Sequence, residues 1–134
     1  MELINIKNDL HLFGIQVNTF PKGVKEAFDR IIAMVPDGMQ RAHYAISYME
    51  GEKIIYHAAC EEKYKGEAEK LNCNSYTVEK GDYLAIKITG WMKRIDAIKE
   101  AFHKMLNDPR ADLTKSCVEW YKTGEEMICM MKVK

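Results

Sequence analysis

One octapeptide that occurs twice decides the fold: VKEAFDRI at residues 24–31 returns 74 residues later as IKEAFHKM at residues 98–105. Four of the eight positions are identical and three carry conservative exchanges. In both copies the apolar residues recur three and four positions apart, which is the spacing of one face of an amphipathic helix. The sequence therefore predicts two similar helices, one in each half of the chain.

A β-hairpin pattern follows each predicted helix. Residues 42–60 contain two apolar stretches around Gly51, and residues 117–133 contain two around Gly124. Glycine accepts the positive φ that a tight turn needs. The two hairpins match each other at an offset of 73 residues, close to the offset of the helices.

The register of the first hairpin stays open at this point. Its loop has either two or three residues, and this choice decides whether Ile55 or Tyr56 shares a face of the sheet with Tyr48.

A predicted strand also precedes each helix, over residues 10–20 (with a start as early as residue 3) and over residues 76–89 with a break at Lys80-Gly81-Asp82. Each half of the chain then has the order strand, helix, strand, strand, with halves of about 1–62 and 75–134 in one domain. We predict an α+β fold with pseudo-twofold symmetry, in which a curved antiparallel sheet carries helices on one face and a ligand cleft on the other.

The segment between the two halves, residues 61–74, is strongly charged and contains Gly66. It is a candidate linker or lid, and its charged run from residue 63 to residue 70 is expected to be a solvated loop.

One carboxylate breaks the agreement between the halves. The strand CVEWY at residues 117–121 alternates so that Glu119 shares a face with Cys117 and Tyr121. At the hairpin offset, Ile46 takes the place of Glu119 in the first half. The architecture therefore does not require an acid there, and we predict that Glu119 belongs to a ligand site.

A carboxylate in an aromatic cleft pays a desolvation cost unless it is paired, so it suits an organic cation, which aromatic faces also attract. The residues expected to supply these faces are Tyr44, Tyr48, Tyr121 and Trp91.

The second half also resembles a known family. The stretches VEKGDYLA (78–85), TGW (89–91) and VEWY (118–121), separated by the amphipathic helix, are similar to those of the GyrI-like (gyrase-inhibitor-like) small-molecule-binding family. This family includes the effector-binding domains of AraC-type and MerR-type transcription regulators. The resemblance extends over essentially the whole chain and agrees with the duplicated layout.

The resemblance implies a ligand cleft in which a glutamate attracts cationic, aromatic or lipophilic compounds. The family's glutamate corresponds to Glu119, its tyrosine to Tyr121, and the aromatic residue after the strand-ending glycine to Trp91. The chain departs from the family pattern in having Lys80 where proline is usual and Trp120 where a small aliphatic residue is common.

These observations favour a stand-alone domain that binds a cationic or lipophilic small molecule and acts as a sensor or a sequestering protein. No helix-turn-helix segment is expected, so regulation would need a separate partner regulator or a homodimer. Two alternatives remain: a hydrolase of electrophilic small molecules, in which Glu119 would orient or deprotonate a water, and a protein-interaction module that inhibits a partner.

The composition disfavours several other classes of function. The 134 residues include 20 Lys and Arg against 20 Asp and Glu, which leaves no basic field for direct nucleic-acid binding. No apolar run approaches 18 residues and no signal peptide is evident, so we expect no membrane segment and a cytoplasmic location. The four histidines and four cysteines lack metal-ligand spacing, so we expect no metal, no cofactor and free, buried thiols.

Overall fold

The computed structural model describes residues 1–134 and contains one eight-stranded antiparallel sheet and three α-helices. No helix combines the length and the apolar character needed to cross a bilayer. The strands are β1 (Glu2–Ile6), β2 (Leu10–Gln16), β3 (His43–Glu50), β4 (Lys53–Glu61), β5 (Asn74–Val78), β6 (Gly81–Thr89), β7 (Cys117–Tyr121) and β8 (Glu126–Lys132). The α-helices are α1 (Val24–Ala33), α2 (Glu67–Lys70) and α3 (Ile95–Leu106), and short 3₁₀ turns cover Gly38–Gln40 and Trp91–Lys93.

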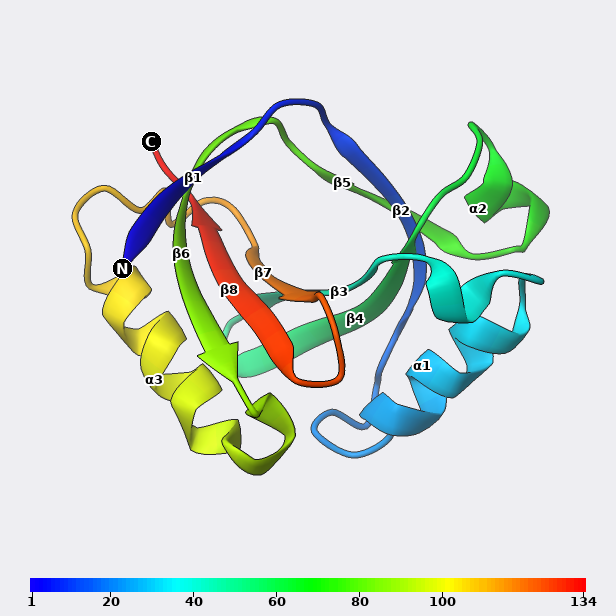
Figure 1. Ribbon diagram of the computed structural model, residues 1–134, viewed down its shortest axis with the longest axis horizontal. Coiled ribbons are helices and arrows are strands. Elements are labelled where there is room, and N and C mark those ends of the chain that lie inside the picture. Colours follow the sequence, from blue (N-terminus) through cyan, green and yellow to red (C-terminus); the bar gives the residue numbers. More distant parts are fainter.

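The strand order, β1-β6-β8-β7-β3-β4-β2-β5, places two units of the same layout side by side. One unit is β2-α1-β3-β4 and the other is β6-α3-β7-β8, and they meet where β3 pairs with β7. Figure 1 shows the sheet curled like an open half-barrel, with α1 and α3 on its outside. The predicted α+β fold with a curved antiparallel sheet is therefore confirmed, while the sequence duplication stays a prediction.

The first strand of each half crosses to the other half. The sequence suggested one long strand near the N-terminus, but the chain forms two, β1 and β2, which lie at opposite ends of the sheet. β1 pairs with β6 of the second unit, and β5 pairs with β2 of the first. The two crossing connections touch, because the amide of Lys80 donates a 2.8 Å hydrogen bond to a carboxylate oxygen of Asp9.

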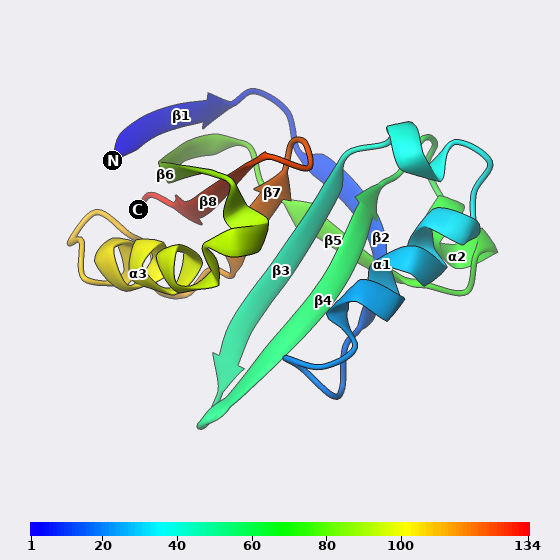
Figure 2. The same cartoon turned by 60° about the horizontal axis from the view of Figure 1, so that its bottom comes forward.

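Both long helices cover the outer face of the sheet. Ala27 and Ile31 of α1 pack on Ala45 and other buried residues of the first unit, and Ala101 and Met105 of α3 pack on the second. These contacts come from the stripe that the octapeptide predicts, since its buried positions are one helical turn apart. In Figure 2, α1 and α3 lie to either side of the long β3–β4 hairpin.

The inner face of the sheet is filled by a separate apolar cluster. Its buried members are Leu12, Tyr44, Ile46, Ala59, Val78, Tyr83, Ala85, Val118 and Met130. Strand alternation therefore gives this sheet two packed faces, one under the helices and one inside the curve.

The open register of the first hairpin is resolved by a two-residue turn. Glu50 pairs with Lys53, so only Gly51 and Glu52 form the turn, and Gly51 has a φ of 65°. Ile55 then lies directly opposite Tyr48 on the inner face. Its neighbour Tyr56 consequently points to the outer face, beneath the helices.

All four cysteines are free thiols. Cys60 and Cys129 are buried, as expected, whereas Cys73 and Cys117 are half-buried.

The expectation of a solvated loop over residues 63–70 is wrong for Glu67. This carboxylate is only 3% exposed and binds the Arg41 guanidinium through two hydrogen bonds, of 2.6 and 2.9 Å. It also accepts a 2.8 Å hydrogen bond from the Lys63 amide. Hydrogen bonding from Arg41 lowers the pKa of Glu67, opposed by burial. A buried partner that the local charge pattern does not reveal therefore fixes this segment to the sheet.

We predict that Glu67→Gln lowers the free energy of unfolding by about 3 kcal/mol, because it leaves the buried Arg41 without its main counter-charge. Urea unfolding at pH 7 measures this change. Glu69→Gln is the matched control, since Glu69 is exposed in the same helix, and it should change stability by less than about 0.5 kcal/mol. Equal stabilities of the two variants would show that the Arg41–Glu67 pair does not anchor the segment.

Candidate functional site

Glu119 lies in the middle of the outer face of the sheet. It is directly opposite Ala45 of β3 and Cys129 of β8, which pack under α1 and α3 respectively. The residue is 8% exposed. The sequence predicts this carboxylate in a groove on the face away from the helices, but the structure places it on the face that the helices cover. Alternation along the strand predicts which residues share a face with Glu119. Which of the two faces the helices cover depends on the pairing of β3 with β7, which the sequence pattern of one strand does not show.

A short hydrogen-bond chain holds one oxygen of the carboxylate. The Tyr121 hydroxyl donates to Oε1 of Glu119 over 2.8 Å. Because Tyr121 has only one proton to give, the Tyr56 hydroxyl, 3.3 Å away, donates to Tyr121 in turn. Tyr56 is only 4% exposed, so the chain runs from the carboxylate into the core of the first unit.

The other oxygen is free. Oε2 of Glu119 makes no hydrogen bond and keeps some contact with solvent, because it is not among the buried polar atoms without a partner. No lysine, arginine or histidine nitrogen lies within 4 Å of the carboxylate. Glu119 thus combines deep burial with a single hydrogen bond and no counter-ion.

Burial raises the pKa of Glu119 to about 7, and the hydrogen bond from Tyr121 opposes this rise only in part. The neighbouring thiols and hydroxyls move in the same direction. Burial and the charge of Glu119 raise the pKa of Cys117 to about 11, and they also raise those of Cys129, Tyr56 and Tyr121. Near pH 7, Glu119 is therefore the group in this cluster that changes its charge.

Aromatic rings surround this cluster and come from both units. The ring of Phe28 in α1 meets Tyr121 edge-on at 5.5 Å, and the ring of Trp91, just before α3, lies 4.9 Å from Tyr121. At the other end of the hydrogen-bond chain, the ring of Phe20 stacks on that of Tyr56 at 4.5 Å. The Trp91 indole also donates a 3.1 Å hydrogen bond to the carbonyl of Thr123.

The structure brings together three of the five predicted site residues, Glu119, Tyr121 and Trp91. It places the other two, Tyr44 and Tyr48, on the inner face of the sheet. Tyr44 is buried and stacks on Trp120 at 6.2 Å. Tyr48 is 41% exposed beside His57.

Three aromatic residues near Glu119 were not predicted from the sequence. Phe28 belongs to the repeated octapeptide, whose apolar stripe predicts a helix face and no ligand site. Tyr56 depends on the hairpin register that the sequence left open, and Phe20 reaches the site only through Tyr56. The signal for Phe28 was present, because its octapeptide position lies on the sheet-facing stripe of the helix.

A histidine also lies beside the cluster. His43 of β3 is directly opposite Tyr121, and its ring meets Phe28 edge-on at 6.2 Å. Its Nε2 is the one buried side-chain nitrogen or oxygen without a hydrogen-bond partner. Burial lowers the pKa of His43, so this ring stays neutral at and above pH 7.

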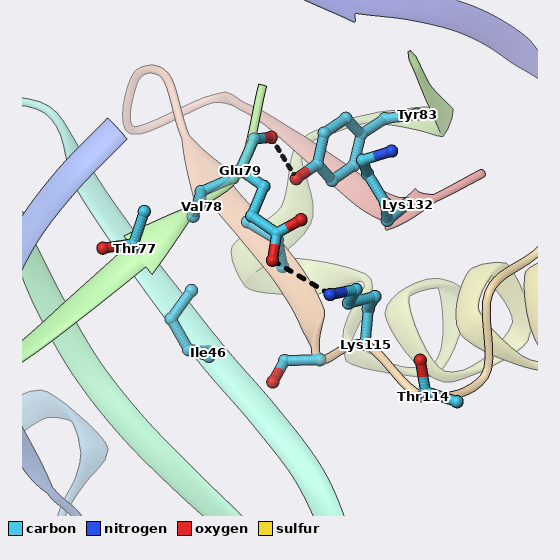
Figure 3. Close-up of a pocket in the computed structure, with 10 residues that line it drawn as sticks. Ile46, Thr77, Val78, Glu79, Tyr83, Thr114, Lys115 and Lys132 are labelled. Carbon is cyan, nitrogen blue, oxygen red and sulfur yellow. Dashed lines mark hydrogen bonds and ion pairs between the residues drawn. The ribbon is translucent and has the colours of Figure 1, made fainter. Parts of the chain in front are cut away.

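The inner face carries a distinct pocket with a cavity volume of about 200 Å³. Figure 3 shows Glu79 and Lys115 facing each other across it, joined by a 2.9 Å ion pair, above the side chain of Ile46. Val118, the neighbour of Glu119 in β7, also lines this pocket. The pocket therefore lies on the opposite face of β7 from Glu119. Glu79 is half-exposed and already paired, in contrast to Glu119. Glu119 lines neither this pocket nor the shallow one around residues 92–100.

No family model matches the chain, and no curated protein matches its sequence. Solved structures do match its fold. An integron cassette protein from the mobile metagenome of Vibrio cholerae matches with a TM-score of 0.69 at 14% identity, covering 99% of this chain and 95% of that one. The structure of SAV2435 bound to tetraphenylphosphonium matches with a TM-score of 0.64 at 12% identity, covering 99% and 93%.

A third match is a hydrolase from Listeria innocua, with a TM-score of 0.65 at 11% identity, covering 99% of this chain and 91% of that one. These structures share the architecture over nearly their whole length at only 11–14% identity. The chain therefore has the same fold as a protein solved with tetraphenylphosphonium and a protein described as a hydrolase.

Proposed function

We propose that this chain is a GyrI-like small-molecule-binding domain that receives lipophilic organic cations at Glu119. The observation that carries this proposal is the buried Glu119 carboxylate, which accepts one hydrogen bond and has no cationic partner. Aromatic rings from both units pack on Tyr121, the residue that donates this hydrogen bond. In this role the domain would act as a sensor or as a sequestering protein for such compounds.

The physical reason is the cost of the isolated charge. Moving a carboxylate out of water is strongly unfavourable unless a counter-charge or several hydrogen bonds replace its hydration. An organic cation supplies that counter-charge. A lipophilic cation also loses little hydration when it enters, and its charge is attracted to the faces of Trp91 and Tyr121.

Access to Glu119 requires a side chain to move, because the residue is only 8% exposed and the rings of Phe28 and Trp91 pack on its partner Tyr121. Trp91 is the side chain that we expect to move. It is half-buried, belongs to a three-residue 3₁₀ turn and is held by one hydrogen bond to Thr123. The fold supports the same ligand class by analogy, since SAV2435 was solved with tetraphenylphosphonium bound.

The proposal predicts that the protein binds tetraphenylphosphonium and that Glu119→Gln weakens this binding at least about tenfold. The variant keeps the shape of the side chain but removes the charge, and an interaction with a charged group contributes about 1.5–3 kcal/mol. Isothermal titration calorimetry at pH 8 measures both dissociation constants.

The matched control is Glu79→Gln, which removes the carboxylate of the inner-face pocket instead. Binding should keep its wild-type affinity in this variant. The opposite pattern, in which Glu79→Gln abolishes binding and Glu119→Gln does not, would place the cation site on the inner face and contradict the proposed role of Glu119.

The proposal also predicts a stability cost for the ligand site. Because the pKa of Glu119 is raised to about 7 in the folded state from the ordinary 4.5, its contribution to stability is present at low pH and is lost as pH rises toward 7. Between pH 5 and pH 8 the wild type should lose about 2.5 kcal/mol of unfolding free energy relative to Glu119→Gln.

Urea unfolding of both proteins at pH 5 and pH 8 tests this difference. Each protein serves as its own reference, so the burial of the glutamine amide cancels between the two pH values. Parallel pH profiles of wild type and variant would mean that Glu119 is solvated in the folded protein, and it would then be a poor receptor for a cation.

A second candidate function is hydrolysis of an electrophilic small molecule. The favouring observation is the raised pKa of Glu119 together with its free Oε2, because a carboxyl group that titrates near 7 can act as a general base toward water. Turnover would appear as product in excess over protein that is lost in Glu119→Gln. Ligand recovered unchanged after prolonged incubation would reject hydrolysis and leave the binding function in place.

A further inference from the structure

The two oxygens of Glu119 are not equivalent, and this asymmetry decides where a proton would go. Oε1 accepts the hydrogen bond from Tyr121, whereas Oε2 accepts no hydrogen bond and keeps some contact with solvent. A proton added to the carboxylate therefore belongs on Oε2. The resulting hydroxyl would be a donor that water or the acceptor oxygen of a bound ligand can satisfy.

No hydroxyl or thiol near the carboxylate changes its charge between pH 6 and pH 8, and no cation holds Glu119 ionised. The titratable groups around it are Tyr121 and Cys117 on β7, Cys129 on β8, Tyr56 on β4 and, beside Tyr121, His43 on β3. The hydroxyls and thiols have raised pKa values and stay neutral over that range. Burial lowers the pKa of His43, and the Glu119→Gln titrations at both pH values show any part of the pH effect that comes from this ring. From the helix side, Phe28 of α1 contributes only an aromatic ring.

We propose that the Glu119 site receives two chemical classes of ligand: lipophilic cations when the carboxyl group is ionised, and uncharged lipophilic hydrogen-bond acceptors when it carries a proton on Oε2. The inference rests on the proposed function at Glu119 and extends it to a second class of ligand. The same aromatic rings hold both classes, and one proton selects between them.

The proton balance differs between the two classes. A cation that binds to the protonated site breaks the Oε2–H bond and sends that proton to the solvent. An uncharged acceptor keeps the Oε2–H bond and accepts a hydrogen bond from it. When this acceptor binds to the ionised site, one proton is taken up from the solvent. Ligand affinity and solution pH are therefore linked in opposite directions for the two classes.

Two triaryl phosphorus compounds of similar shape make a direct test. Tetraphenylphosphonium carries a permanent positive charge, and triphenylphosphine oxide is uncharged with one strong acceptor oxygen. Both are titrated into the protein at pH 6 and pH 8 by calorimetry. A group with a pKa near 7 is about one-tenth ionised at pH 6 and nine-tenths at pH 8. The cation should therefore bind about tenfold more tightly at pH 8, and the phosphine oxide about tenfold more tightly at pH 6.

Glu119→Gln separates the proton from the shape of the site. Its amide is an uncharged donor at both pH values, so the phosphine oxide should bind it with the pH 6 affinity of the wild type throughout. Cation binding by this variant should be weak at both pH values. Repeating the wild-type titrations in phosphate and in Tris, whose heats of ionisation differ, counts the protons released or taken up.

The outcomes distinguish this inference from the proposed function. Cation affinity that is lost in Glu119→Gln but does not change with pH, or failure of the phosphine oxide to bind at pH 6, would overturn the two-class inference and leave cation binding intact. Cation binding that survives Glu119→Gln would overturn the proposed function itself. Opposite pH trends that both disappear in Glu119→Gln would support the inference.

Discussion

The pairing of β3 with β7 is the contact on which the rest of the structure depends. It joins the two units and sets Ala45 opposite Glu119, so that both α1 and α3 cover the same face of the sheet. It also places Tyr121 between Phe28 and Trp91. A slip of one residue in this pairing would exchange the two faces of β7, and Glu119 would then lie among the aliphatic side chains of the inner cluster.

Glu119 is the point at which the sequence departs from what the fold alone would favour. The residues directly opposite Glu119 on the neighbouring strands, Ala45 and Cys129, are small and buried. An aliphatic residue in place of Glu119 would avoid the desolvation of a carboxylate. This exception to the packing rule, with aromatic rings from both units on its hydrogen-bond partner Tyr121, supports the proposal that Glu119 serves binding rather than stability. The contrast with Glu67 supports this view, because Glu67 is also buried but is fully paired by Arg41.

Sequence patterns predicted both helices, the hairpins and the grouping of Glu119 with Tyr121, because each depends on periodicity within one element. They did not predict which face of β7 the helices cover, because that depends on pairing between distant strands. Tyr44 and Tyr48 were assigned to the site by residue type alone, and alternation along β3 puts them on the other face. The charge pattern around Glu67 predicts a solvated residue, because its partner Arg41 is 26 residues away in the sequence.

The crossing of β1 and β5 makes the two halves of the chain depend on each other for their sheet edges. Each half lends its first strand to the sheet edge of the other, as two subunits do in a domain-swapped dimer. A polypeptide with only one unit would keep a strand without a partner and an edge without a cover, and two copies would satisfy both needs at once. In this chain both strands are exchanged within one polypeptide, so neither half can complete its sheet edge without the other.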